Sequence, residues 1–267
     1  MTALLHAKGL GKCFGQVVAA KDIDVELAHD ATVGLIGTNG AGKTTFVNMI
    51  TGYLKPDSGQ IFLEGLDITR LPPRAIVRLG VCRSFQIPQL FGSQTAFQNL
   101  VIGLGAALRN SGSGSVFSGY GGSVPGYDMS VPEVADMLLE RFGIQGYRNK
   151  PVRKLPGGVR KMLDVALAMT IKPKVVLLDE PTSGVSADEK LEMVSRTLNA
   201  IRLAGATVLF IEHDMDIVKR FSQRVLAFAE GRVIADGSSQ SVFAQEDVQR
   251  LVLGRRHHTP PGVLISA

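Results

Sequence analysis

One eight-residue segment constrains the fold of this chain more than any other feature: GTNGAGKT, at positions 37–44. It fits the pattern G-x-x-x-x-G-K-[ST] at every fixed position. The apolar run Thr32–Ile36 leads into it and is predicted to be a strand, and a helix is predicted over Lys43–Leu54. A strand, a glycine loop and a helix in that order predict a phosphate-binding loop within an α/β fold.

The residue types in this segment suit the phosphate groups of a nucleotide. Glycines let backbone N–H groups turn inward around phosphate oxygens, and the helix that begins near Lys43 adds its positive end. Lys43 is placed to reach the β- and γ-phosphates, and the Thr44 hydroxyl is placed to ligate Mg²⁺. The residues predicted to bind phosphate are Gly37, Thr38, Asn39, Gly40, Ala41, Gly42, Lys43, Thr44 and Thr45.

Two more apolar runs end in polar, chemically active residues. Lys174–Leu178 is followed by Asp179 and Glu180, and Ala206–Ile211 by a Glu-His-Asp triplet that contains His213. The carboxyl ends of parallel strands are where open α/β folds bind ligands. Asp179 suits a water-bridged contact to Mg²⁺, and Glu180 suits a general base for an attacking water; a solvated acidic turn is the alternative. His213 could polarise the γ-phosphate, although a lone histidine is more often a surface or capping residue.

The composition excludes disorder as the main state, because the 267 residues are 45% hydrophobic and their net charge is only +5. This mildly basic balance fits an anionic ligand, a membrane-side protein or a solvated surface equally well. Two cysteines, Cys13 and Cys82, do not make a disulfide framework. No apolar stretch is long enough to span a bilayer, and the N-terminus lacks the apolar core of a secretory signal. We therefore expect a cytoplasmic protein that reaches a membrane only through a partner.

Apolar strands that alternate with helices predict a parallel sheet covered on both faces. The other predicted strands are Asp22–Leu27, Gln60–Glu64 and Val81–Phe85, and the other predicted helices are Thr95–Arg109, Pro132–Phe142, Val159–Ile171 and Asp188–Arg202. Glycine and serine crowd residues 111–127, where we expect a flexible loop. The chain is thus predicted to be an α/β core with a helical portion inserted between about residues 87 and 170.

Together these motifs resemble the nucleotide-binding subunits of ABC transporters over nearly the whole chain. The resemblance implies an ABC-type P-loop ATPase domain over residues 1–254, with a parallel-sheet core and an antiparallel β portion. Within it the α/β core covers about 1–86 and 171–254, a helical subdomain covers about 87–170, and residues 255–267 form a flexible tail. MgATP is the implied ligand and ATP hydrolysis the implied reaction.

Several residues take their roles only from this resemblance. Phe14 matches the aromatic residue that stacks on adenine, with a core aromatic as the alternative. Gln86 matches the glutamine that links Mg²⁺ and the attacking water to a transmembrane partner, a role both catalytic and metal-binding. His213 matches the switch histidine at the γ-phosphate. Leu155–Val159 falls where the family has its Leu-Ser-Gly-Gly-Gln signature.

In the family the signature contacts the γ-phosphate held by the other subunit of a head-to-tail dimer. Gly157 and Gly158 remain to let the backbone approach that phosphate, but Pro156 replaces serine and Val159 replaces glutamine. Pro156 offers neither a hydroxyl nor a backbone N–H. Ser186 also stands where the family usually has aspartate. Two readings stay open: the altered signature weakens one site of the dimer, or the two glycines suffice.

The segments CRSFQIPQLF, IEHDM and DVQRLVLG narrow the resemblance to the ATPases of branched-chain amino acid importers, whose relatives handle urea, amides or aromatic acids. The implied partners are transmembrane permease subunits docked near residues 87–108, a second ATPase subunit in a homo- or heterodimer, and indirectly a periplasmic or extracellular solute-binding protein. No nucleic-acid partner is expected, and the implied location is the cytoplasmic face of the cell membrane.

Two alternatives stay open. The first is a soluble ABC-type ATPase without a permease, which usually carries a long coiled-coil insertion or two cassettes; neither is seen in this sequence. The second is a regulatory nucleotide-binding subunit that hydrolyses little ATP, and the altered signature is its only support.

Overall fold

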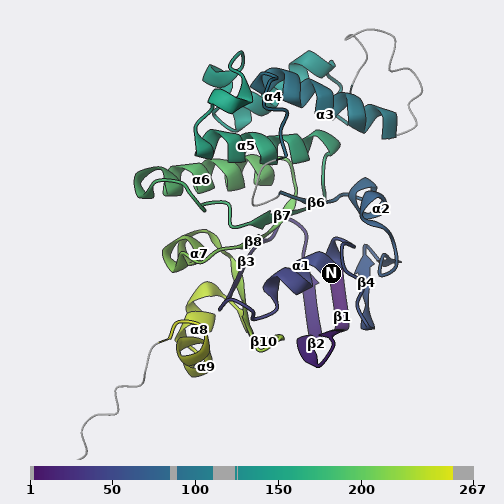
Figure 1. The fold of residues 1–267 in the computed structure, drawn as a ribbon, viewed down its shortest axis with the longest axis vertical. Helices are drawn as coiled ribbons and strands as arrows, with labels where there is room; N and C mark the ends of the chain where they lie inside the picture. The colour runs from purple at the N-terminus through teal and green to yellow at the C-terminus, as the bar shows by residue number, and fades with distance from the viewer. Residues whose placement is uncertain (1–2, 85–88, 111–123, 125, 255–267) are drawn as a thin grey trace, which may run out of the picture.

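The structure is a computed structural model that describes residues 3–84, 89–110, 124 and 126–254 (Figure 1). A six-stranded sheet runs through the middle of the molecule in the order β10-β9-β3-β8-β7-β6. All neighbouring strands in it are parallel except β9 and β10, which are antiparallel. Its strands are β3 (Thr32–Gly37), β6 (Val81–Arg83), β7 (Val175–Asp179), β8 (Thr207–Ile211), β9 (Arg224–Ala229) and β10 (Arg232–Gly237).

Both faces of this sheet are buried, and strand β7 shows how. Its alternate residues point to opposite faces: Val175 and Leu177 pack into one hydrophobic cluster, and Val176 and Leu178 pack into another. A strand covered on both sides needs apolar residues at nearly every position. The prediction of a parallel sheet covered on both faces is confirmed.

A second, antiparallel sheet lies against helix α1 (Lys43–Ile50) in the order β2-β1-β4-β5. Phe46 of α1 shares a hydrophobic cluster with Leu10 and Ile23 of this sheet and with Leu35 of the central sheet. Helix α1 is therefore packed between the two sheets, as Figure 1 shows, and the loop before it lies where they meet. The strands are β1 (Leu5–Phe14), β2 (Val17–Leu27), β4 (Ser58–Leu63) and β5 (Leu66–Asp67).

Three helices gather at the top of Figure 1, on the opposite side of the central sheet from β1 and β2. They pack through fully buried side chains, among them Leu100, Phe142 and Leu163. These helices are α3 (Ala96–Asn110), α4 (Val131–Arg141) and α5 (Gly157–Ala168). The remaining helices are α2 (Pro73–Arg78), α6 (Ala187–Leu203), α7 (Met215–Phe221), α8 (Ser239–Ala244), α9 (Glu246–Leu251) and the short 3₁₀ helices η2 (Gln145–Tyr147), η3 (Val152–Lys154) and η4 (Met169–Ile171).

The end of the glycine- and serine-rich segment packs against these helices. Val124 is 3% exposed and belongs to their hydrophobic cluster, and the Tyr127 hydroxyl donates a hydrogen bond to the Met169 carbonyl at 2.8 Å. Val124 and Tyr127, at the end of the predicted flexible loop, are therefore held by packing and by a hydrogen bond. Residues 111–123 and 125 lie outside the described residues.

Two predicted helices have different bounds in the structure. The helix expected to reach residue 54 ends at Ile50, because Gly52 adopts a left-handed φ of 76°. The helix expected to begin at residue 159 begins at Gly157, and its last turn tightens into η4. The strand expected to begin at Asp22 begins at Val17, and the strand expected over 81–85 is seen as Val81–Arg83, with residue 85 outside the described residues. The other predicted strands and helices lie within two residues of their expected bounds.

Both cysteines are free, Cys13 exposed and Cys82 buried. Among the described helices, none combines the length and the apolar character needed to cross a membrane. The predicted tail, residues 255–267, lies outside the described residues.

Candidate functional site

The glycine loop is held at the carboxyl end of β3, between the two sheets. Gly42 adopts a φ of 102°, and a Cβ atom there would lie 2.7 Å from the Ala19 carbonyl oxygen. A Cβ atom on Gly37 would likewise lie 2.4 Å from the Phe228 carbonyl oxygen. Because real side chains do not tolerate such contacts, these two positions require glycine, and the backbone forms the wall of the site.

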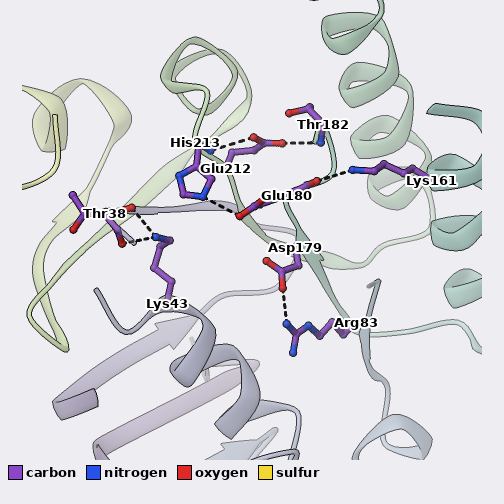
Figure 2. Close-up of polar contacts among 10 residues, drawn as sticks. Thr38, Lys43, Arg83, Lys161, Asp179, Glu180, Thr182, Glu212 and His213 are labelled. Carbon is purple, nitrogen blue, oxygen red and sulfur yellow. Dashed lines mark hydrogen bonds and ion pairs between the residues drawn. The ribbon is translucent and has the colours of Figure 1, made fainter. Parts of the chain in front are cut away.

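Lys43, the first residue of α1, points back into this loop (Figure 2). Its Nζ atom donates to the carbonyl oxygens of Gly37 at 2.6 Å and of Thr38 at 3.0 Å. Burial lowers the pKa of Lys43, while the nearby carboxylates of Glu180 and Asp179 raise it. The loop thus places the Lys43 ammonium opposite the carboxylates of Asp179 and Glu180, where the phosphate groups are predicted to bind.

A hollow surrounds Lys43 and brings most of the predicted site residues together. Thr44 is exposed and Thr45 half-buried on its wall. Glu180 and His213 reach it from the far side, across the ends of β7 and β8. The residues that line the hollow are Asn39, Gly40, Ala41, Gly42, Lys43, Thr44, Thr45, Glu180, Ile211 and His213.

The Glu180 and His213 side chains meet directly. The Nε2 atom of His213 lies 2.9 Å from Oε1 of Glu180, with the two side chains 45% and 27% exposed. The parallel pairing of Asp179 with Ile211 brings these strand ends into register. Glu180 itself has a φ of 48°, a left-handed conformation that costs a non-glycine residue roughly 1–2 kcal/mol. The backbone strain at Glu180 and the contact of its carboxylate with a histidine make this residue a candidate general base.

Asp179 is held by Arg83, an arginine within the segment CRSFQIPQLF to which the sequence analysis gave no role. Arg83 of β6 donates to the Asp179 carboxylate at 2.5 Å and to Asn48 Oδ1 at 2.6 Å. Both charged side chains are largely buried, Arg83 at 11% and Asp179 at 16% exposed. Arg83 lies three residues before Gln86, and that proximity is the one sequence signal that could have indicated it.

Two other residues behind the hollow were also missed. The Glu212 carboxylate is buried and accepts a hydrogen bond from the Thr182 backbone N–H at 2.9 Å. Lys161 of α5 donates to the Glu180 carbonyl oxygen at 3.0 Å. Figure 2 shows Glu212 between His213 and Thr182, and Lys161 on the right, reaching Glu180. Glu212 stands in the segment IEHDM, but the sequence analysis gave a role only to the histidine beside it. Lys161 follows the signature segment and belongs to no motif that the sequence analysis used.

Phe14 stands at the end of β1 with its ring 53% exposed. It pairs with Val17 at the start of β2, and two residues further along β2 the Ala19 carbonyl lies against Gly42. Lys12 Nζ lies 5.8 Å from the centroid of the Phe14 ring. The structure therefore excludes the alternative of a core aromatic and puts Phe14 on a hairpin beside the loop, although not on the wall of the hollow.

The segment that matches the family signature lies at the start of α5, away from the hollow around Lys43. Pro156 is the N-cap residue of α5, and its side chain forms no capping hydrogen bond. Gly158 and Val159 line a separate groove with apolar residues such as Met162. Gly157 is exposed beside that groove. Gln86, the remaining predicted site residue, lies outside the described residues.

Comparison with known proteins agrees with this geometry. A family model described as "ABC transporter" matches residues 20–183. The high-affinity branched-chain amino acid transport ATP-binding protein LivG of Escherichia coli K12 is 34% identical over 254 residues, which cover 94% of this chain and 98% of the relative. The probable branched-chain amino acid transport ATP-binding protein LivG of Archaeoglobus fulgidus is 32% identical over 254 residues, covering 94% of this chain and 95% of the relative.

Solved structures agree as well. The ADP conformation of MJ1267, an ATP-binding cassette of an ABC transporter, has a TM-score of 0.78 and 26% sequence identity, and the match covers 96% of this chain and all of that one. The family model spans more than half of the chain, and the relatives match nearly its whole length. With a phosphate loop, the Glu180 carboxylate and a histidine around one hollow, this chain belongs to the ABC transporter family, as an ATP-binding cassette.

Proposed function

We propose that this chain binds MgATP and hydrolyses it as the ATPase subunit of a membrane importer. One observation carries the hydrolytic part of this proposal: the carboxylate of Glu180 meets His213 at 2.9 Å on the side of the hollow opposite Lys43. A base and a polar partner across from a phosphate-binding lysine are what attack of water on a terminal phosphate requires.

In the proposed binding step the phosphates occupy the loop. Backbone N–H groups of residues 37–45 and the start of α1 surround the phosphate oxygens. The Lys43 ammonium, which here donates to two loop carbonyls, turns to the β- and γ-phosphates. Phe14 stacks on the adenine ring from the exposed end of its hairpin.

In the proposed hydrolytic step Glu180 takes a proton from the attacking water. The water oxygen forms a bond to the γ-phosphorus while the bond to the bridging oxygen breaks, and ADP leaves with that electron pair. His213 donates to the γ-phosphate and keeps the Glu180 carboxylate aimed at the water. Gln86 is assigned to the same water, on the side that faces the transmembrane partner.

The donor set beside Lys43 fits Mg²⁺. The exposed Thr44 hydroxyl is a hard oxygen ligand, the Asp179 carboxylate suits a water-bridged contact, and the Gln86 amide would add a further oxygen. Within the described part of the chain no three His, Cys, Asp or Glu side chains form a metal cluster, which agrees with an ion held mainly by phosphates and water. When bound, Mg²⁺ neutralises charge on the β- and γ-phosphates.

A second ATPase subunit completes each site in this proposal. Gly157 and Gly158 lie at the exposed start of α5, apart from this chain's own hollow, so they are available to another subunit's γ-phosphate. The dimer is formed with a like or an unlike partner. Because Pro156 brings no hydroxyl and no N–H, the site that this α5 completes is the weaker one.

The solute is proposed from the relatives, two of which are named for branched-chain amino acid transport. We propose import of a branched-chain amino acid or a related small polar solute, through permease subunits that receive it from a solute-binding protein. The chain then lies on the cytoplasmic face of the membrane, with no nucleic-acid partner.

The permease contact is assigned to a groove beside β6. Its lining includes Tyr53, Val77 and Gln89, and Phe91 nearby is 54% exposed. An exposed apolar surface of this kind suits a docking helix. Within residues 87–108 not every apolar side chain is available, since Leu100 is fully buried.

Transport by the assembled complex tests this function. Membrane vesicles that contain the chain with its permease are loaded with ATP and supplied with the solute-binding protein, and uptake of labelled leucine, isoleucine and valine is measured. Uptake should require ATP and be lost with Lys43→Ala, while the matched surface variant Lys8→Ala transports normally. If the full chain purifies without membrane proteins, and a cysteine at Phe91 crosslinks only to another soluble ATPase, the importer assignment is wrong and a permease-free ATPase is favoured.

A further inference from the structure

Glu212 is a buried charge that none of the proposed chemistry uses. It follows β8 directly, is 3% exposed, and accepts two backbone hydrogen bonds. One oxygen accepts from the N–H of Thr182 at 2.9 Å, and the other accepts from the N–H of His213 at 3.2 Å. Burying a carboxylate costs free energy unless it is fully paired. A buried glutamate at position 212 therefore needs a structural or functional explanation.

The two hydrogen bonds of Glu212 join chain segments that lie beyond the last backbone hydrogen bond between β7 and β8. The ladder between β7 and β8 ends with the N–H of Glu180 donating to the Ile211 carbonyl at 3.0 Å. Beyond that point the chain after β7 and the chain after β8 are bridged by the Glu212 side chain (Figure 2). This bridge sets the spacing of the two segments from which Glu180 and His213 reach each other.

Lys161 of α5 also contacts the segment that follows β7. Its Nζ atom donates to the Glu180 carbonyl oxygen at 3.0 Å. Burial lowers the pKa of Lys161, while the carboxylates of Glu212 and Glu180 raise it, so the ammonium lies near both of them. Lys161 therefore offsets the buried charge of Glu212 and holds the carbonyl of Glu180, whose left-handed backbone needs support.

We propose that Glu212 and Lys161 act together as positioning residues, which hold the Glu180 carboxylate and the His213 ring in register for attack on the γ-phosphate. The inference rests on the proposed ATPase function. Neither side chain lines the hollow around Lys43, so both act through Glu180 and His213. Since Lys161 lies in the second turn of α5, the pair also ties the start of that helix, at Pro156 and Gly157, to the reacting centre.

The test is steady-state ATP hydrolysis by the full chain with its partners. Glu212→Gln keeps the shape, but its amide nitrogen then faces a backbone N–H, and the register loosens. Misplacement of a reacting group on this scale lowers kcat roughly tenfold or more, with the KM for ATP and the Kd for ATP unchanged. Lys161→Met should do the same, Lys161→Arg should restore most of the rate, and the exposed Glu140→Gln should match the wild type.

The double variant separates positioning from simple loss of stability. If the two residues form one unit, Glu212→Gln with Lys161→Met loses no more rate than the worse single variant. Rates that multiply, a rise in KM that matches the fall in kcat, or a normal kcat in Glu212→Gln and in Lys161→Met would overturn the proposal. If the positioning proposal fails in this way, the proposed ATPase function still stands as long as the wild-type protein hydrolyses ATP and the Glu180→Gln protein does not. A Glu180→Gln protein with normal turnover removes the proposed function itself, and this inference with it.

Discussion

Arg83 is the single residue on which the geometry of Asp179 most depends. Its guanidinium spans the Asp179 carboxylate on β7 and the Asn48 amide oxygen on α1. Through it the acidic strand end and the helix of the phosphate loop are fixed relative to each other. A short arginine–carboxylate contact in a largely buried place holds direction as well as distance.

Removing Arg83 should therefore cost stability in a way that a surface arginine does not. Arg83→Met leaves Asp179 without this counter-ion at 16% exposure, and loss of one partner of a buried pair costs about 3 kcal/mol or more. The matched control is Arg250→Met, whose pair with Asp247 is as short but more than 60% exposed on both sides and is worth less than about 1 kcal/mol. Urea unfolding measures both. Equal losses of stability in the two variants would show that the buried Arg83–Asp179 pair stabilises the fold no more than an exposed pair.

In helix α3 (Ala96–Asn110), packing against α5 and intrinsic helix propensity act in opposite directions at a glycine. Gly103 and Gly105 lie two residues apart in this helix. A Cβ atom on Gly103 would lie 2.3 Å from Leu167 of α5, whereas a Cβ atom on Gly105 would meet nothing within 4 Å. An added methyl group at Gly103 therefore forces the end of the Leu167 side chain to move, whereas one at Gly105 has open space.

These two glycines give a matched pair of variants. Gly105→Ala should raise the free energy of unfolding by about 0.5–1 kcal/mol, because alanine restricts the unfolded chain and favours helix. Gly103→Ala should lower it, since crowding a packed contact costs about 1–3 kcal/mol and exceeds that gain. Thermal unfolding of the two proteins decides the point. Stabilisation by both substitutions would mean that α3 and α5 are not packed as closely as the structure has them.

Pro156, the N-cap residue of helix α5, allows a test of the altered signature. Its φ of −55° and ψ of 154° are those of an N-cap residue, so serine fits without a change of backbone and can cap the helix. A regained hydrogen bond to a charged phosphate is worth about 1.5 kcal/mol or more, so Pro156→Ser should raise the ATPase rate of the assembled complex about tenfold. Val159 is better left unchanged, because it is 8% exposed beside an apolar groove.

Pro72→Ser is the control for that experiment, since Pro72 caps α2 with nearly the same backbone angles and also forms no side-chain capping bond. It should add comparable helix stability without changing the ATPase rate. A rate for Pro156→Ser equal to that of the wild type, with assembly verified, would mean that Gly157 and Gly158 are sufficient and the altered signature is neutral.

At the scale of the whole molecule, the parts that the sequence predicts are those governed by local pattern. The phosphate loop, the apolar strands β7 and β8 and the family follow from short motifs and from burial on both faces of one sheet. Between Asp214 and the segment DVQRLVLG, the chain that forms α7, β9, β10 and α8 carries no motif that the sequence analysis used. Its strands complete the sheet through long-range pairing, as when Val33 pairs with Arg224, and such pairs are not encoded in neighbouring residues.

The same contrast holds within the site. Lys43, Glu180 and His213 could be predicted because each follows a strand in a recognisable pattern, and the structure brings them to one hollow. Arg83, Lys161 and Glu212 could not. Apart from the N–H of His213 next to Glu212, the partners cited for them lie 19 to 96 residues away along the chain. Only the folded arrangement brings these three charged residues to the site.

The central claim is that Glu180 activates water for attack on ATP held at Lys43. The most direct measurement compares ATP binding and ATP turnover in Glu180→Gln with those of the surface variant Glu140→Gln. Because the substitution keeps shape and removes the base, the Kd for MgATP should stay within about threefold while turnover falls at least about a hundredfold; Glu140→Gln should resemble the wild type in both. A Glu180→Gln protein that binds and hydrolyses ATP at the wild-type rate would contradict the account.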